Sequence, residues 1–231
     1  MGLGRLEQPC ASGREQHAAG GRRRERRKGQ AERRREAQHA SPPKGGLFAL
    51  FLAMAELYPS LCVFDLDWTL WPLDVDTDRS PPFTATAGVV RDKHGTPCEL
   101  YPEVRSVFAR LQAAGVRIAY ASRTTDPGAA EALLKAHGLW EALRGDRGLF
   151  QAYPSGGALG GDRAAKTRHF AAIFEALGGE GSPRQTLFFD DLQVNIEVAR
   201  RSGVTGVQVG RGVTLGSLEA GLAAWRLAQK Q

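Results

Sequence analysis

This chain has few cysteines and no apolar run long enough to cross a membrane. Its three cysteines, Cys10, Cys62 and Cys98, cannot form a complete set of disulfides, and none lies at metal-ligand spacing. The apolar run at residues 47–54 is far shorter than the about 20 residues of a spanning helix, and no convincing secretory cleavage site accompanies it. We therefore expect a protein of a reducing, cytoplasmic compartment with no membrane partner.

Residues 1–46 contain few large apolar side chains and no aromatic ones. They contain twelve of the 31 Lys and Arg and five of the 25 acidic residues, so the remainder is nearly neutral, with 19 basic and 20 acidic side chains. A segment of this kind cannot bury enough surface to offset the entropy of ordering. We predict a basic, disordered N-terminal extension over residues 1–53 and a folded domain over residues 57–231.

Two basic runs, residues 22–28 and 33–35, lie in the predicted extension. Such runs occur in nuclear addresses and in nucleic-acid patches. Because no aromatic residues are interleaved with them, we expect a solvated extension without a nucleic-acid partner, and nuclear localisation is the alternative if the extension is present. Met54 is the only methionine after Met1, so translation from Met54 would yield the whole predicted domain without the extension.

From residue 61 onward, short runs of β-forming residues alternate with helical patterns. This alternation is typical of a parallel sheet with crossover helices, so we predict a Rossmann-like three-layer α/β/α fold. The predicted strands are 61–64, 116–121, 149–153, 186–189 and 206–209. The predicted helices are 103–114, 127–137, 164–177, 192–202 and 215–228.

A segment rich in Pro and Asp, at about residues 72–100, follows the first predicted strand. The pair His94-Gly95 favours a hairpin turn. We therefore predict a small β-hairpin insertion beside the carboxyl end of that strand. It is too small to be a domain but large enough to line the mouth of an active site.

Polar side chains follow three of the predicted strands, and a lysine lies near the start of a later helix. In an open parallel sheet the ligand crevice lies outside the carboxyl ends of the strands, so we expect these side chains to converge. Taken alone, the aspartates and Ser122 are more often turn or cap residues, and Lys166 is more often a solvated surface lysine. The converging residues are Asp65, Asp67, Ser122, Arg123, Lys166, Asp190 and Asp191.

Carboxylates beside a hydroxyl, a lysine and an arginine describe a magnesium site next to a phosphate site. Mg²⁺ prefers a few hard oxygen ligands, with a substrate phosphate completing its coordination. Lysine and Ser or Thr bind phosphoryl oxygens, and an aspartate is a competent nucleophile toward phosphorus. The residue types therefore predict phosphoryl chemistry.

These residues resemble the motifs of the haloacid dehalogenase (HAD) superfamily: Asp-x-Asp-x-Thr, a strand-end Ser or Thr, a Lys and an acidic pair. Longer stretches, at residues 64–72, 100–104, 121–124 and 188–191, resemble the magnesium-dependent phosphatase-1 group. The resemblance runs from about residue 57 to the end of the chain. The residues that match the four motifs are Asp65, Asp67, Thr69, Ser122, Lys166, Asp190 and Asp191.

The resemblance implies a Mg²⁺-dependent phosphatase that hydrolyses phosphate monoesters through an aspartyl-phosphate. Asp65 would be the nucleophile, and Asp67 would act as general acid and then as general base. The metal would be held by the Asp65 carboxylate, the Asp67 backbone carbonyl and Asp190, with Asp191 and Thr69 outside the coordination sphere. The phosphate ligands implied are the side chains of Ser122, Arg123 and Lys166 and the backbone amides of Leu66 and Asp67.

Two departures from the group affect these expectations. A Gly-rich insertion at residues 155–165 separates Tyr153-Pro154 from Lys166, and Asp74 stands where the group has an aromatic residue at the substrate mouth. Protein phosphotyrosine and fructosamine 6-phosphates both remain open as substrates, and the oligomeric state is undetermined.

Two other classes of function remain open. A phosphoryl-accepting signalling domain also uses Asp, Mg²⁺, Ser or Thr and Lys, but in a different order along the chain. A nucleic-acid-binding protein would use the basic extension. Among single residues, His169 is interpreted as structural, whereas Trp68 and Trp71 could line the substrate mouth or pack in the core.

Overall fold

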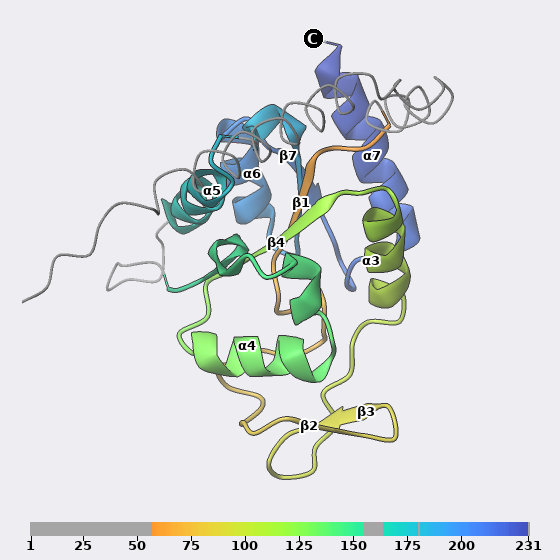
Figure 1. Cartoon of the computed structure of the whole chain (residues 1–231), viewed down its shortest axis with the longest axis vertical. Coiled ribbons are helices and arrows are strands. Elements are labelled where there is room, and N and C mark those ends of the chain that lie inside the picture. Colours follow the sequence, from red (N-terminus) through yellow and green to blue (C-terminus); the bar gives the residue numbers. More distant parts are fainter. Residues whose placement is uncertain (1–56, 155–163, 180, 231) are drawn as a thin grey trace, which may run out of the picture. The chain divides into compact units, whose positions relative to one another are not determined.

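The computed structural model describes residues 57–154, 164–179 and 181–230 (Figure 1). The chain divides into two units, Met1–Ala49 and Leu50–Gln231, and all described residues belong to the second. The predicted extension, Met54, Cys10 and residues 155–163 of the Gly-rich insertion lie outside the described residues.

Five parallel strands form the central sheet in the order β5-β4-β1-β6-β7. β1 lies in the middle because its short apolar run is buried throughout and pairs on both sides, Leu61 with both Arg117 and Thr186. The α/β class predicted from the alternating pattern is confirmed. The strands are β1 (Leu61–Phe64), β4 (Arg117–Ser122), β5 (Phe150–Ala152), β6 (Thr186–Asp190) and β7 (Thr205–Gln208).

Helices cover both faces of the sheet, with α3 and α7 on one side and α5 and α6 on the other (Figure 1). Each predicted helix is found, with bounds that shift by one or two residues at most. The helices are α3 (Val104–Ala113), α4 (Pro127–Ala136), α5 (Ala164–Ala176), α6 (Gln193–Arg201) and α7 (Leu215–Gln229). Single 3-10 turns lie at Trp140–Leu143, Arg147–Leu149 and Pro183–Gln185.

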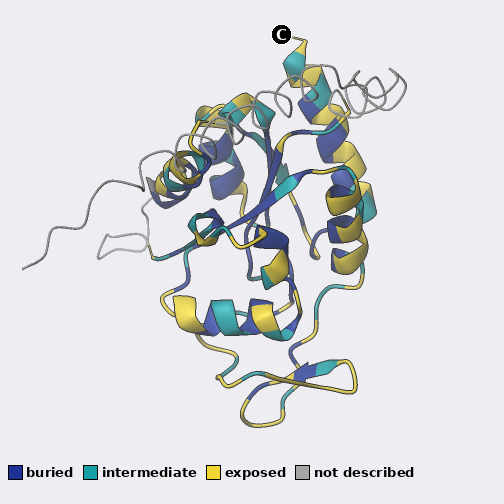
Figure 2. Cartoon of the chain, viewed as in Figure 1, coloured by how far each residue is buried: buried dark blue, intermediate teal, exposed yellow. Residues whose placement is uncertain are grey.

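The core lies between the sheet and these helices, where Figure 2 shows the strands as buried. The ring of Phe64 in β1 stacks on Phe189 of β6, with centroids 5.1 Å apart, and lies 4.9 Å from Phe108 of α3. Cys62 is fully buried in β1 as a small apolar side chain, and Cys98 is buried and also unpaired. This packing holds the carboxyl ends of β1 and β6 side by side.

The predicted β-insertion contains an antiparallel hairpin of β2 (Thr84–Thr86) and β3 (Val89–Arg91). Its turn is at Ala87-Gly88, where both residues have positive φ, 52° and 81°. The expected turn at His94-Gly95 also forms, because Gly95 N donates to Asp92 O at 3.0 Å. It returns the chain to β3 through the Arg91–Pro97 bridge. β2 and its turn were not predicted.

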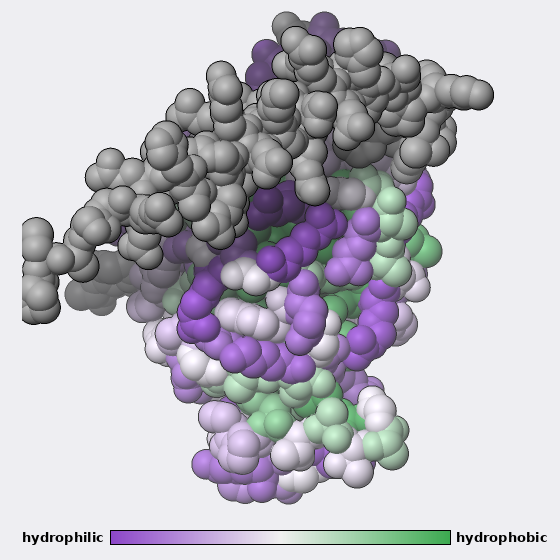
Figure 3. Space-filling view, in the orientation of Figure 1, coloured by the Kyte–Doolittle hydropathy of each residue, from purple (hydrophilic) through white to green (hydrophobic). Residues whose placement is uncertain are grey.

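On the face drawn in Figure 3, hydrophilic residues dominate around α4, and hydrophobic residues gather between α4 and the β2–β3 hairpin. The hydrophilic surface around α4 fits an amphipathic helix, because the apolar side chains of α4 that are buried lie on one face: Ala129, Ala130, Leu133 and Leu134. Within the three described ranges, no helix combines the length and apolar character needed to cross a bilayer.

Candidate active site

The chain turns sharply directly after β1. Asp65 N donates to Phe189 O at 2.9 Å, which extends the β1–β6 contact by one residue. The carbonyl of Leu66 then accepts the N–H groups of Thr69, at 3.2 Å, and Leu70, at 2.8 Å, which closes a tight turn. Trp68 in this turn has a φ of 58°, a conformation that non-glycine residues rarely adopt and that is enriched at functional sites.

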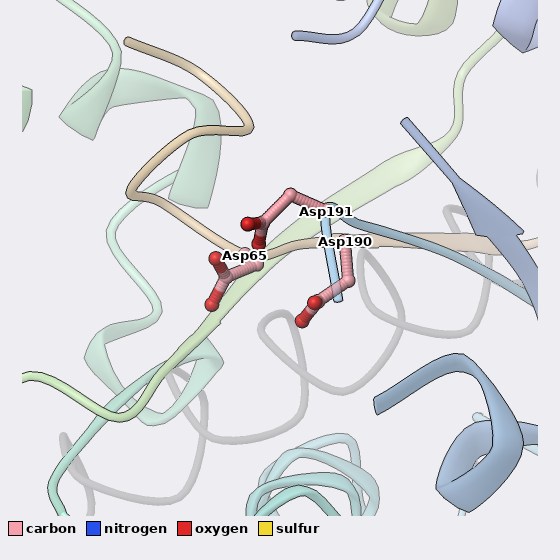
Figure 4. A group of neighbouring side chains, drawn as sticks. All are labelled: Asp65, Asp190 and Asp191. Atoms are coloured by element: carbon pink, nitrogen blue, oxygen red, sulfur yellow. The ribbon is translucent and has the colours of Figure 1, made fainter. Parts of the chain in front are cut away.

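The carboxylates of Asp65, Asp190 and Asp191 come together at the ends of β1 and β6 (Figure 4). One oxygen from each lies within 4.8 Å of the others. Asp190 is fully buried, Asp65 is 8% exposed, and Asp191 is half-buried. Such a cluster needs cations, because close carboxylates repel one another strongly when water is excluded.

Lys166 provides one of these cations. Its side chain is 1% exposed, and its Nζ lies 2.6 Å from Asp65 Oδ1 and 3.1 Å from Asp190 Oδ2. It also donates to the carbonyl of Ala121 at the end of β4. Burial alone would lower the pKa of Lys166, but the two carboxylates outweigh it and raise the pKa. The structure therefore brings Lys166 to the site across the Gly-rich insertion, between the two carboxylates.

Asp190 accepts three hydrogen bonds from two donor groups besides Lys166. Asn195 Nδ2 lies 2.9 and 3.0 Å from its two oxygens, and Leu192 N donates to Oδ1 at 2.9 Å. Asn195 was not predicted as a site residue. Asn195 lies on the first turn of α6, about one helical turn after the acidic pair, and this spacing was the signal that could have indicated it.

Burial raises the pKa of Asp65 well above its usual range. Lys166 opposes this rise, while the charges of Asp190 and Asp67 add to it. Burial also raises the pKa of Asp191 to about 6, and neighbouring Asp190 contributes. Three carboxylates with one ammonium leave a surplus of negative charge, which a divalent cation would offset.

The donor set fits Mg²⁺. Carboxylate oxygens are the hard ligands that this ion prefers, and the open side of the cluster leaves room for water and a substrate phosphate. Asp65, Asp190 and Asp191 are the side chains that could hold it. The assignment of the metal to Asp190 rather than Asp191 stays a prediction, because each of these residues has a carboxylate oxygen within 4.8 Å of one from Asp65. The role of the Asp67 backbone carbonyl as a metal ligand also stays a prediction.

Asp67 lies in a different environment from the cluster. Its Oδ1 accepts Trp71 Nε1 at 2.7 Å and Val75 N at 3.2 Å, and no cation pairs with it among the described residues. Burial raises the pKa of the Asp67 carboxyl to about 7, the hydrogen bond from Trp71 opposes the rise, and the charges of Asp74 and Asp76 add to it. Asp67 can therefore hold or release a proton near neutral pH.

The two tryptophans after Asp67 have separate roles. Trp71 is fully buried and donates to Asp67, so it orients the carboxyl group from the core. Trp68 is 46% exposed and lines the cavity instead. Thr69 is fully buried, and its Oγ1 has no hydrogen-bond partner among the described residues.

Ser122 and Arg123 follow β4 and line the same cavity as Asp65. Ser122 is buried, and its Oγ accepts Thr124 N at 3.2 Å. Because that contact uses a lone pair, the hydroxyl proton remains free for a phosphoryl oxygen. Arg123 makes no hydrogen bond or ion pair with the described residues, so its guanidinium can also reach an anion in the cavity.

His169 packs against the loop after β5. It is fully buried, its ring contacts that of Tyr153 with centroids 4.3 Å apart, and its Nε2 lies 3.2 Å from Tyr153 O. Burial, helped by nearby Lys166, lowers the pKa of His169 to about 3, so the ring is neutral. These contacts favour the structural interpretation.

Five of the predicted residues, Asp65, Asp67, Ser122, Arg123 and Asp191, line one cavity of about 590 Å³. Lys166 and Asp190 are buried and do not belong to its lining. The cavity walls combine the carboxylate cluster, the loop after β4 and the first part of the insertion. Asp76, which was not predicted, belongs to this lining. The lining residues are Asp65, Asp67, Trp68, Asp74, Asp76, Ser122, Arg123, Thr124, Pro154, Asp191, Leu192 and Asn195.

Comparison with known proteins finds phosphatases similar to this chain. A family model described as Acid Phosphatase matches residues 57–228. Human Magnesium-dependent phosphatase 1 is 39% identical over 177 residues, which cover 76% of this chain and 92% of the relative. A HAD-like hydrolase superfamily protein of Schizosaccharomyces pombe is 34% identical over 151 residues, which cover 64% of this chain and 84% of the relative.

Solved structures of low sequence identity also align with the chain. One is a HAD-superfamily hydrolase from Ehrlichia chaffeensis, at 12% identity and a TM-score of 0.47, covering 73% of this chain and 98% of the other. The family assignment rests on the sequence matches, and the fold on the sheet described above. The chain therefore belongs to the acid phosphatase family of the haloacid dehalogenase superfamily, in the magnesium-dependent phosphatase-1 group.

Proposed function

We propose that this protein hydrolyses phosphate monoesters with Mg²⁺ through an aspartyl-phosphate on Asp65. The observation that carries the proposal is the contrast between two aspartates in one cavity. Asp65 is paired with Lys166 at 2.6 Å, whereas Asp67 has no cation partner among the described residues and its pKa is about 7. Two carboxyl groups in environments this different fit a nucleophile and an acid–base group.

In the first step, a carboxylate oxygen of Asp65 attacks phosphorus, and the bond from phosphorus to the leaving oxygen breaks. Asp67 donates its proton to that oxygen, which leaves as an alcohol. Ser122 and Arg123 bind the phosphoryl oxygens during the transfer. Asp65, Asp190 and Asp191 could hold Mg²⁺, which when bound would supply positive charge to offset the negative charge of the phosphoryl transfer.

In the second step, water attacks the phosphorus of the aspartyl-phosphate. Asp67, now ionised, takes a proton from this water, and the bond from phosphorus to the Asp65 oxygen breaks. Inorganic phosphate leaves and Asp65 is a carboxylate again. A carboxyl group with a pKa near 7 suits both directions of proton transfer at neutral pH.

The cavity mouth favours fructosamine 6-phosphates over phosphotyrosine as substrates. Asp74 places a negative charge at the mouth, where a protonated amine of the leaving group would be attracted. Exposed Trp68 and Leu192 on the same rim offer apolar surface to either kind of leaving group.

The test is phosphate release from a panel of a fructosamine 6-phosphate, the corresponding amine-free sugar phosphate, a phosphotyrosine peptide and p-nitrophenyl phosphate. Each is assayed with Mg²⁺ and with chelator. Release that requires Mg²⁺ supports the proposal, and no release from any member would overturn it.

Asp74→Asn tests the substrate preference. Asn keeps an oxygen that can accept Asp76 N, as Asp74 Oδ1 does at 2.9 Å, but removes the charge. We expect kcat/KM for the fructosamine 6-phosphate to fall about fivefold relative to the amine-free sugar phosphate, as for loss of an exposed ion pair. An unchanged ratio would exclude recognition of the amine by Asp74.

A further inference from the structure

The first part of the insertion alternates between the core and the cavity. Leu73 and Val75 are buried, with exposed fractions of 2% and 1%, whereas Asp74 and Asp76 line the cavity. The buried pair anchors the segment. The packing of Leu73 and Val75 therefore fixes the positions of Asp74 and Asp76 at the cavity.

The Asp76 carboxylate joins this segment to the loop after β4. Its Oδ1 accepts the hydroxyl of Thr124 and, at 3.2 Å, the amide N–H of Asp126. Its Oδ2 accepts both the amide N–H of Thr125, at 2.8 Å, and the Thr125 hydroxyl, at 3.0 Å. Four donors within three consecutive residues therefore converge on one carboxylate.

The loop that Asp76 binds contains two of the predicted phosphate ligands, Ser122 and Arg123. Thr124, whose hydroxyl donates to Asp76, is 4% exposed, and its amide donates to Ser122 Oγ. Asp126 is the N-cap residue of α4, where Oδ1 accepts Ala129 N at 2.8 Å. The bonds to Asp76 thus fix the loop between the end of β4 and the start of α4.

The same segment also holds the acid–base group. Val75, the residue before Asp76, donates its N–H to Asp67 Oδ1 at 3.2 Å. Adjacent residues of the insertion therefore contact the group that moves protons and the loop that binds phosphate. The relative position of these two parts depends on this segment.

We propose that Asp76 is a positioning residue that holds the loop at residues 122–126 so that Ser122 and Arg123 face the phosphoryl group. This inference rests on the proposed function and adds a residue to it. A carboxylate suits the role because it accepts four hydrogen bonds in one plane and, as a charged acceptor, makes them stronger than a neutral group would.

The test compares Asp76→Ala with Asp92→Ala. Asp92 is a matched control, because it also accepts two backbone N–H groups in the insertion, from His94 and Thr96, but these lie within its own turn. Both variants and the wild type are assayed with p-nitrophenyl phosphate at saturating Mg²⁺. Binding of inorganic phosphate to the Mg²⁺-loaded protein is measured separately by calorimetry.

We expect Asp76→Ala to raise KM and the Kd of inorganic phosphate by about tenfold while kcat falls less, since misplaced phosphate ligands weaken binding first. Asp76→Asn should fall between the wild type and the alanine variant, because its amide oxygen keeps two of the acceptor positions. Asp92→Ala should leave all three constants within about twofold of the wild type.

Equal KM and phosphate Kd for Asp76→Ala and Asp92→Ala would show that Asp76 is only a loop cap and would overturn the proposal. If Asp76→Ala does not fold, the same comparison is made with Asp76→Asn and Thr125→Val. Calorimetry also separates the two proposals. A wild type without Mg²⁺-dependent hydrolysis refutes the proposed function, whereas the phosphate Kd still reports on the loop.

Discussion

The carboxyl-terminal end of the central sheet, here called the sheet edge, and the insertion contribute to one cavity in opposite ways. At the sheet edge, Asp65, Lys166 and Asp190 are nearly or fully buried and are held by one another. In the insertion, Asp74 and Asp76 lie at the mouth and interact mainly with backbone N–H groups and hydroxyls. The difference places the charges with the strongest interactions in the core, where water is excluded, and leaves to the more exposed segment the roles in orientation and selectivity that we propose for Asp76 and Asp74.

The largest expected effect comes from Asp65→Asn at the sheet edge. An amide cannot act as the nucleophile, so we expect kcat to fall by at least about 10⁴-fold. The cluster loses a carboxylate but keeps the pair of Lys166 and Asp190, so the protein should still fold. Activity is measured by phosphate release and folding by circular dichroism; residual activity within tenfold of the wild type would exclude Asp65 as the nucleophile.

Lys166→Ala tests whether the sheet edge depends on its buried cation. Removing Lys166 leaves Asp65 and Asp190 buried without their partner, which should destabilise the protein by about 3–5 kcal/mol in the absence of metal. Adding Mg²⁺ should restore part of this loss. Denaturant unfolding with chelator and with Mg²⁺ is the measurement, and a loss below about 1 kcal/mol in chelator would contradict the interpretation.

Asp67→Asn tests the group that the turn after β1 presents. We expect kcat to fall by about 10²–10⁴-fold for esters with poor leaving groups, which need the proton. The fall in the rate of aspartyl-phosphate formation should be smaller for p-nitrophenyl phosphate, whose leaving group needs little protonation. Single-turnover measurements isolate this step, because hydrolysis of the aspartyl-phosphate can otherwise limit kcat. Equal effects on both substrates in single-turnover measurements would argue against general acid catalysis by Asp67.

The smallest expected effect concerns two buried histidines, one beside each region. His137 lies beside the insertion, where burial, and next Arg105, lower its pKa to about 4, and His169 lies beside the sheet edge with a pKa of about 3. Both folded values lie below the unfolded value of about 6.5, so acid favours the unfolded state, which takes up the proton. The stability is present above about pH 6.5 and is lost as the pH falls toward 4.

A fall in pH from 7 to 5 should therefore lower the free energy of unfolding by about 2 kcal/mol for each of the two histidines. His137→Phe and His169→Phe should each remove one such contribution. Denaturant unfolding of each variant and of the wild type at both pH values gives the difference, in which contributions from carboxyl groups cancel. An unchanged pH dependence in either variant would show that the histidine is protonated equally in both states.

The parts that could be predicted from the sequence are those with a strong local pattern. The strands and helices differ from their predicted bounds by one or two residues, because their apolar periodicity is uninterrupted. β2 was missed, because its three residues, Thr84–Thr86, are all exposed and form no apolar face that the sequence pattern could reveal. The site residues after β1, β4 and β6 were predicted because polar side chains there directly follow buried strands.

The two missed residues differ in how far their contacts reach along the chain. Asn195 binds Asp190 only five residues earlier, and its place on the first turn of α6 was a local signal, whereas Asp76 is indicated only by its bonds to residues about 50 positions later. Such contacts leave no local signal, because an aspartate in a Pro-rich and Asp-rich segment has the same pattern whether it caps its own turn, as Asp92 does, or binds another loop.

By itself, the sequence determined the parallel α/β sheet, the order of the polar groups at its edge and the family of phosphatases to which the chain belongs. Those properties depend on local apolar runs and on short motifs. Only the tertiary structure decided that Trp71 and Val75 hold Asp67, that Trp68 faces the cavity, and that Asp76 binds residues 124–126. Burial and hydrogen bonding set these roles, and both arise only when distant segments pack together.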